Sequence, residues 1–277
     1  MEYTRLENLG AVDYMYPGED NAFNQVRKIP LLDQLMGEII AVQTNTSALP
    51  QTQANLYRVT ERSCPKVYAL FELAKARLDM HEEIPLFIQP DFDFNACAYG
   101  GASPFIIIHS SFIKNCSDEE LLFVLGHELG HIKGNHAVYD RIVVELVNKL
   151  LTATGLGRFG VLTEGVTIAL YDWMRKHEYS ADRAGAIASG HPEHAIEAIQ
   201  TLLGVHEKLK GVSVSTQDLL EQHGAYQEEN KSIVSKLVML SQIIKSSHPW
   251  AVDRIHELNQ WMESGEFEAL IQEKAVG

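Results

Sequence analysis

One helix, close to the middle of the chain, limits the fold more than any other feature of the sequence. Ser117-Asp118-Glu119-Glu120 has a hydroxyl at the N-cap and a glutamate three residues later, which predicts a capping box and a helix from Leu121 through His136. This helix contains His127-Glu128-Leu129-Gly130-His131. Residues four apart share one helix face, so the two imidazoles can bind one metal ion. Glu128 lies about 100° round the helix, where it can reach a water on the metal as a general base.

Two glycines stand beside these histidines inside the predicted helix. Gly126 and Gly130 each cost about 0.8–1.0 kcal/mol relative to alanine in a helix interior. We therefore expect another element to pack too closely there for a Cβ atom. The alternative is a pair of solvent-exposed histidines on a surface helix. That alternative does not explain the apolar residues around them, which are Leu121, Leu122, Val124, Leu125, Leu129 and Ile132.

A catalytic zinc ion needs a third protein ligand and keeps a fourth position for water. Glu178 is the best candidate, because Asp182 follows it by four residues on the same helix face. Asp182 would then accept a hydrogen bond from the free ring N–H of a zinc-bound histidine. His177 and His136 are competing ligands, although His177 points elsewhere on its helix and His136 lies outside the spacing of the pair. A solvent-exposed acidic helix face is the other alternative for Glu178 and Asp182.

The rest of the chain indicates an α+β fold that is mostly α-helical. Short β-rich runs at residues 86–88, 95–99 and 105–108 predict one small sheet, preceded by an amphipathic helix that starts at Pro65. Helices should follow from Asp140, before Ser189, after Pro192, over residues 233–244 and after His248-Pro249. Residues 1–61, with a helix at 30–43 and a polar linker at 43–55, predict an N-terminal helical extension. Residues 62–277 form the second predicted domain.

Composition and charge exclude several classes of partner. The 277 residues carry 37 acidic and 23 basic side chains, a formal charge of −14, which disfavours nucleic-acid binding. Charged residues interrupt the most apolar stretch, residues 141–171, so no membrane span is expected, and peripheral membrane contact stays open. No secretory signal is evident, so we expect a cytoplasmic protein. Three cysteines without a C-x-x-C pair argue against disulfides and thiolate zinc sites, and the sequence indicates no oligomeric state.

Four motifs in order are similar to one known family. Besides the His127–His131 motif, these are Glu178-Tyr179-Ser180-Ala181-Asp182-Arg183, the run Phe94-Asn95-Ala96-Cys97-Ala98-Tyr99-Gly100-Gly101, and His248-Pro249-Trp250-Ala251-Val252-Asp253-Arg254. Together they resemble the gluzincin zinc metallopeptidases of the HtpX and CAAX prenyl-protease type. The resemblance extends over approximately residues 30–267. It departs from the better-known members in lacking transmembrane helices, which disfavours membrane-embedded substrates such as prenylated tails.

The resemblance implies a zincin-like fold, with a three-stranded sheet packed on the active-site helix and a helical layer at the C-terminal end. An extended substrate would then lie along an edge strand by β-augmentation. The residues of that strand are Asn95, Ala96, Cys97, Ala98, Tyr99 and Gly100. By the same resemblance, His248 and Arg254 would approach the cleft and help to hold the oxyanion or the ligand shell. Alternatively, His248 merely precedes a helix and Arg254 makes a structural ion pair.

These observations predict a zinc-dependent endopeptidase that acts on extended or unfolded polypeptides. One Zn²⁺ per chain would bind His127, His131 and Glu178, and Glu128 would activate the zinc-bound water. One alternative is a non-catalytic zincin-like protein that binds peptides or a partner and uses zinc structurally. A related alternative is a latent enzyme whose N-terminal extension covers the cleft. Another is a deformylase-type hydrolase with Cys97 as third ligand, although the flanking sequence of that family is missing. A different divalent ion could also replace zinc.

Overall fold

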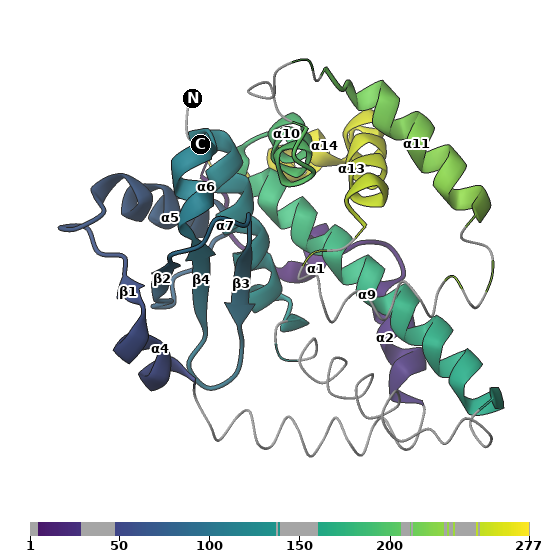
Figure 1. The fold of residues 1–277 in the computed structure, drawn as a ribbon, viewed down its shortest axis with the longest axis horizontal. Coiled ribbons are helices and arrows are strands. Elements are labelled where there is room, and N and C mark those ends of the chain that lie inside the picture. The colour runs from purple at the N-terminus through teal and green to yellow at the C-terminus, as the bar shows by residue number, and fades with distance from the viewer. Residues whose placement is uncertain are drawn as a thin grey trace.

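The computed structural model describes residues 5–28, 48–136, 138, 160–205, 211, 213–229, 232, 235, 248 and 250–276. Within these residues the chain forms a small sheet and a larger set of helices (Figure 1). The predicted helices at 30–43, from Asp140 and at 233–244 lie outside the described residues. The elements, in chain order, are α1 Ala11–Tyr14, α2 Glu19–Arg27, α4 Leu49–Asn55, β1 Tyr57–Arg58, α5 Pro65–Arg77, β2 Leu86–Gln89, β3 Ala96–Tyr99, β4 Phe105–His109, α6 Ser110–Asn115, α7 Asp118–Lys133, α9 Gly160–Ser189, α10 Pro192–Leu202, α11 Thr216–Glu229, α13 Ala251–Ser264 and α14 Glu266–Lys274.

The sheet is mixed and four-stranded, in the order β1-β2-β4-β3. β2 and β4 are parallel, while β1 and β3 run antiparallel to their neighbours. The three predicted strands are present, but the expectation of three strands is wrong, because Tyr57 and Arg58 add a two-residue strand beside β2. That strand is too short to show an alternating pattern in the sequence. β3 lies at the other edge of the sheet, and its outer side carries no further strand among the described elements.

Both faces of the sheet are covered, which explains why β4 is a continuous apolar run. Ile106 and Ile108 point into the main core together with residues of α5 and α7. Phe105 and Ile107 point to the other face, where Leu49 of α4 packs against them. The stretch predicted as a polar linker therefore includes a helix, α4, that closes the outer face of the sheet.

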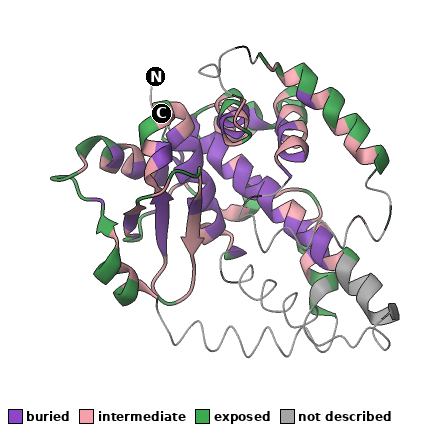
Figure 2. Cartoon of the chain, in the orientation of Figure 1, coloured by how far each residue is buried: buried purple, intermediate pink, exposed green. Residues whose placement is uncertain are grey.

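Helix α7 lies between the sheet and the remaining helices. It contacts α5 and β3 on one side and α9 and α10 on the other. Its predicted capping box is confirmed: Ser117 Oγ accepts a hydrogen bond from the Glu120 amide at 3.1 Å, and Glu120 Oε2 accepts one from the Ser117 amide at 2.6 Å. The helix ends at Lys133 and not at His136, because Asn135 has a positive φ of 59°. Figure 2 shows that its residues are buried along most of its length, as is the middle of α9.

The N-terminal residues pack onto the helices that follow the sheet. α2 contacts α9, and Leu6 pairs with Ala275 in an antiparallel bridge, so the two ends of the described chain lie together. α13 contacts α9, α10 and α11 and begins just after the predicted His248-Pro249 segment. Among the described residues, no helix is long and apolar enough to cross a membrane. The division into domains at residue 61 stays a prediction.

Candidate metal centre

Helices α7 and α9 approach each other closely at the two glycines singled out in the sequence. A Cβ atom on Gly126 would lie 2.2 Å from the Cβ of Ala188, and one on Gly130 would lie 2.6 Å from the Cβ of Ala184. Carbon atoms in ordinary contact are about 3.5–4.0 Å apart, so neither position has room for a side chain. The prediction that another element packs too closely for a Cβ is confirmed. This close packing brings the histidines of α7 next to the acidic residues of α9.

Three side chains from these helices converge on one point. His127 Nε2 lies 3.0 Å from His131 Nε2 and 3.7 Å from Glu178 Oε2, and His131 Nε2 lies 3.4 Å from Glu178 Oε1. Ligand atoms bound tetrahedrally to one zinc ion at its usual bond lengths are about 3.3 Å apart. His248 joins the group, and one ligand atom from each of the four residues lies within 4.8 Å of the others. The spacing of these donors therefore fits a single zinc ion.

The protonation states of the group also suit a metal. Burial lowers the pKa of His127 to about 4, so its imidazole is neutral at pH 7 and a ring nitrogen can offer its lone pair. Burial alone would raise the pKa of Glu178, but the positive charge of His248 and a hydrogen bond from His131 hold it well below its usual value. Glu178 is consequently an anion in a buried site, and its Oε2 atom accepts no hydrogen bond. His248 Nδ1 and Arg254 Nη1 lie 3.4 Å and 3.7 Å from this oxygen, so its charge is compensated while a lone pair stays available for a metal ion.

Asp182 lies one turn beyond Glu178 and contacts the first histidine. Its Oδ1 atom is 2.9 Å from His127 Nδ1, so the carboxylate can fix the ring with Nε2 directed at the cluster. Arg254 of α13 holds Asp182 with two hydrogen bonds, 2.8 Å from Nε to Oδ2 and 2.6 Å from Nη2 to Oδ1. Burial would raise the pKa of Asp182, but the guanidinium of Arg254 lowers it below the usual value. Arg254 thus contacts the cluster mainly through Asp182.

His248 connects the cluster to Glu128 and to the edge strand. Its Nδ1 atom lies 3.1 Å from His127 Nε2, and its Nε2 atom lies 3.0 Å from Glu128 Oε1 and 3.1 Å from the carbonyl oxygen of Ala96. Burial would lower the pKa of His248, but the carboxylates of Glu128 and Glu178 raise it well above its usual value. Burial would raise the pKa of Glu128, and the charge of His248 lowers it. A cationic imidazole and an anionic carboxylate therefore face each other beside the candidate ligands.

The predicted substrate strand lies next to this site, because the Ala96 carbonyl contacts His248. Its residues face different parts of the structure. Asn95 directs its carbonyl into the sheet, where it accepts from the His109 amide at 2.9 Å, and Tyr99 stacks on Phe105 at 4.5 Å between ring centroids. Backbone groups alternate in an antiparallel strand, so those of Ala96 and Ala98 point to the free edge. Cys97 belongs to β3 but not to the metal group, and Gly100 follows the strand.

The two competing ligands lie outside the group. His177 Nε2 is 3.8 Å from Glu178 Oε1, and His136 Nε2 instead contacts Glu19 of α2 at 2.9 Å. Sequence reasoning did not identify Glu19, since nothing in the sequence near this residue marks it as a partner of a histidine 117 positions away.

Comparison with known proteins gives a consistent result. The model of peptidase family M48 matches residues 50–262. The chain belongs to peptidase family M48. A chloroplastic, plastoglobule-localized metallopeptidase 48 of Arabidopsis thaliana is 25% identical over 270 residues, covering 96% of this chain and 77% of that protein. A protease HtpX homolog of Polynucleobacter necessarius is 26% identical over 250 residues, covering 81% of this chain and 82% of that protein.

Membership of this family confirms the resemblance to HtpX-type metallopeptidases and implies metallopeptidase activity.

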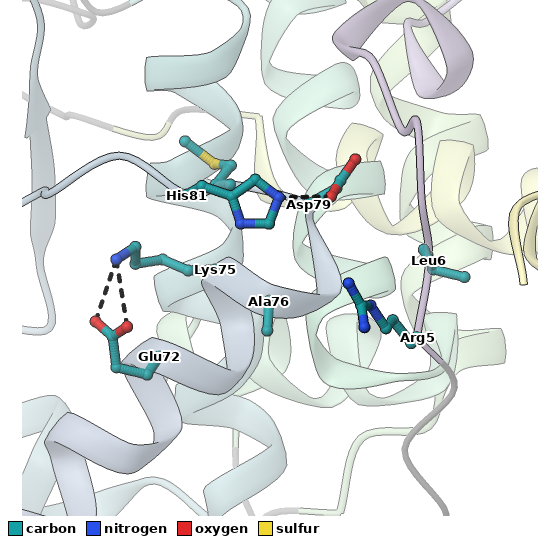
Figure 3. Close-up of a pocket in the computed structure, with 8 residues that line it drawn as sticks. Arg5, Leu6, Glu72, Lys75, Ala76, Asp79 and His81 are labelled. Atoms are coloured by element: carbon teal, nitrogen blue, oxygen red, sulfur yellow. Dashed lines mark hydrogen bonds and ion pairs between the residues drawn. The ribbon is translucent and has the colours of Figure 1, made fainter. Parts of the chain in front are cut away.

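A hollow of about 420 Å³ lies away from the candidate metal centre, between α5 and the N-terminal segment, and both charged and apolar side chains line it (Figure 3). Lys75 pairs there with Glu72, and His81 pairs with Asp79. None of the predicted site residues lines this hollow.

Proposed function

We propose that this chain is a zinc-dependent endopeptidase of extended or unfolded polypeptides, with a zincin-like fold and one Zn²⁺ held by His127, His131 and Glu178. The observation that carries the proposal is the convergence of the three donors at 3.0–3.7 Å with Glu128 beside them. Bound zinc would lower the pKa of a water molecule towards about 7 and polarise the scissile carbonyl. A cytoplasmic location stays a prediction.

In this proposal Glu128 moves the proton. Its carboxylate is ionised, and its Oε2 atom is buried and accepts no hydrogen bond, so it can take a proton from the attacking water. The same carboxyl group then gives the proton to the leaving amine. His248 places a positive charge next to the reacting carbonyl and stabilises the negative charge that develops on its oxygen.

The remaining residues position these groups. Asp182 and Arg254 hold the ring of His127, so Arg254 acts through Asp182. The free edge of β3, at Ala96 and Ala98, offers backbone groups to an extended substrate. His248 Nε2 lies 3.1 Å from the Ala96 carbonyl oxygen, so the imidazole that faces Glu128 also lies at the strand edge where substrate would bind.

Cleavage of unfolded casein by the zinc-loaded protein tests the proposal. Glu128→Gln should lower kcat by about 10²–10⁴-fold or more, because it removes the general base, while zinc stoichiometry stays unchanged. Glu119→Gln is the matched control, since it makes the same substitution in the first turn of the same helix. Equal cleavage by wild type and the Glu128 variant would refute the role of Glu128, and absence of cleavage by wild type would refute the endopeptidase.

A further inference from the structure

A second cluster of buried polar side chains lies beside the candidate ligands. Glu19 Oε1 is 2.9 Å from His136 Nε2, and its Oε2 atom accepts a hydrogen bond from the hydroxyl of Ser180. All three residues are buried. Glu19 is the first residue of α2, in a part of the chain that precedes the region matched by the family model, residues 50–262.

The cluster contacts the metal centre through the imidazole rings of His136 and His177. His136 stacks on His177, with ring centroids 5.1 Å apart and planes 20° apart. Both rings meet His131 edge to face, at 5.4 Å from His136 and 5.5 Å from His177. The ring of His131 is therefore packed against these two imidazoles as well as that of His127, and His136 is held by Glu19.

The backbone after α7 fixes where His136 lies. The positive φ of Asn135 turns the chain at the end of the helix. A Cβ atom on Gly134 would lie 2.4 Å from His136 Nε2, so the imidazole packs directly over this glycine. Gly134 therefore confines the imidazole of His136 on one side. The Nε2 atom of that ring is hydrogen-bonded to the carboxylate of Glu19.

The other oxygen of Glu19 reaches the helix that carries Glu178. Ser180 lies between Glu178 and Asp182 in the sequence of α9, and its hydroxyl also accepts a hydrogen bond from the Tyr16 amide at 2.8 Å. Burying an ionised carboxylate is costly unless it is paired, and Glu19 is paired at both oxygens. Burial would raise its pKa, but His136 and Ser180 lower it below the usual value.

We propose that Glu19 is a positioning residue of the metal centre. Through His136 it holds the ring of His131, and through Ser180 it holds the part of α9 that carries Glu178 and Asp182. The N-terminal segment, residues 5–28, thus helps to position the metal ligands, although it lies outside the matched family region. This inference rests on the proposed function, because it takes His131 and Glu178 to be ligands.

The test compares Glu19→Ala, Glu19→Gln and the control Asp20→Asn in the full-length protein. Asp20 is the next residue of α2, is exposed, and loses the same charge in its variant. Zinc affinity is measured by competition with a chromophoric chelator, and kcat and KM are measured with a casein-derived peptide. Removing a group that hydrogen-bonds directly to a ligating histidine weakens metal binding about 10–100-fold. Glu19 acts on His131 through His136, which places its effect at the lower end of that range, about 10-fold. We expect that loss in Glu19→Ala, together with a lower kcat and an unchanged KM.

Glu19→Gln should recover part of the affinity, because its amide oxygen can still accept one of the two hydrogen bonds. Asp20→Asn should behave as wild type. All measurements are made below the unfolding temperature of each variant, so that a loss of affinity does not reflect unfolded protein. If Glu19→Ala does not fold, a normal zinc affinity of Glu19→Gln with kcat unchanged overturns the inference.

The results also separate this inference from the proposed function. Wild-type zinc affinity in Glu19→Ala, with only a lower melting temperature, would show that Glu19 is a packing residue and would overturn the inference alone. Zinc binding by wild type without cleavage would overturn the endopeptidase, and the affinities of the Glu19 variants would still test the inference. Failure of wild type to bind zinc would overturn both.

Discussion

Adding a single methyl group at Gly126 should destabilise this protein, although the same change normally stabilises a helix. The new Cβ would lie 2.2 Å from the Cβ of Ala188, 3.1 Å from the Cα of Gly185 and 3.2 Å from the carbonyl oxygen of Ala184. Carbon atoms need about 3.5 Å or more, so α7 and α9 would have to separate by roughly 1.3 Å. Two of the three contacts are with backbone atoms, which cannot rotate away.

The magnitude follows from two opposing terms. Overpacking of this kind costs about 1–3 kcal/mol, and alanine recovers about 1 kcal/mol of helix propensity relative to glycine. Because the backbone of α9 is in the way, we place the overpacking cost at the upper end, for a net loss of about 2 kcal/mol. For a chain of this size that loss lowers the melting temperature by roughly 4–8 °C.

The matched control is Gly224→Ala in α11, where a Cβ would meet nothing within 4 Å. This change keeps only the propensity gain of about 0.8–1.0 kcal/mol, so it should raise the melting temperature by roughly 2–4 °C. Thermal unfolding of the metal-free variants by circular dichroism measures both shifts. An unchanged or higher melting temperature for Gly126→Ala would refute the claim that the helices are in contact at this point.

Three further predictions concern the site. Asp182→Asn should weaken zinc binding about 10–100-fold, as measured by chelator competition, because the amide cannot provide the charged partner that His127 and Arg254 now share. His248→Ala should lower kcat by about 10²-fold without changing zinc stoichiometry, if His248 stabilises the oxyanion, and loss of zinc instead would make it a ligand. The folded-state pKa of Glu19 is below that of the unfolded chain, so its ionised form stabilises the protein above about pH 4.3 and this contribution is lost as the pH falls through the folded-state value. The metal-free wild type should therefore lose more stability than Glu19→Gln as the pH is lowered from about 5 to about 3, and parallel losses would contradict this assignment.

Much of the site could be predicted because its determinants are local. The capping box and the spacing of His127 and His131 depend on residues within a single helix, and so does the spacing of Glu178 and Asp182. Local periodicity also located the three longer strands and the helices that start at Pro65, at Pro192 and after His248-Pro249. The two glycines of α7 also carried long-range information, since their cost in a helix interior requires a close neighbour elsewhere in the chain.

The parts that could not be predicted depend on contacts between distant residues. β1 has two residues and exists through its pairing with β2, and α4 was hidden in a polar stretch because only Leu49 and its neighbours face the sheet. α11 has a mixed polar sequence, and it is anchored in part by His223, whose ring lies 2.9 Å from Asp253 of α13. The role of Glu19 is the clearest example. Acidic residues are common in the first turn of a helix because they interact favourably with the helix dipole, so the sequence gives no sign that Glu19 has a further role.

The position of Glu19 bears on whether the N-terminal extension restrains this M48 peptidase. Under the latency hypothesis, a chain that begins near Thr60 loses a cover and gains activity. Under the positioning role of Glu19, the same truncation removes the partner of His136 and weakens the metal site. The two effects oppose each other in one truncated protein, so its activity reports only their difference. Glu19→Ala in the full-length chain separates them, because it leaves every other residue of the extension in place and removes only the carboxylate beside the ligands.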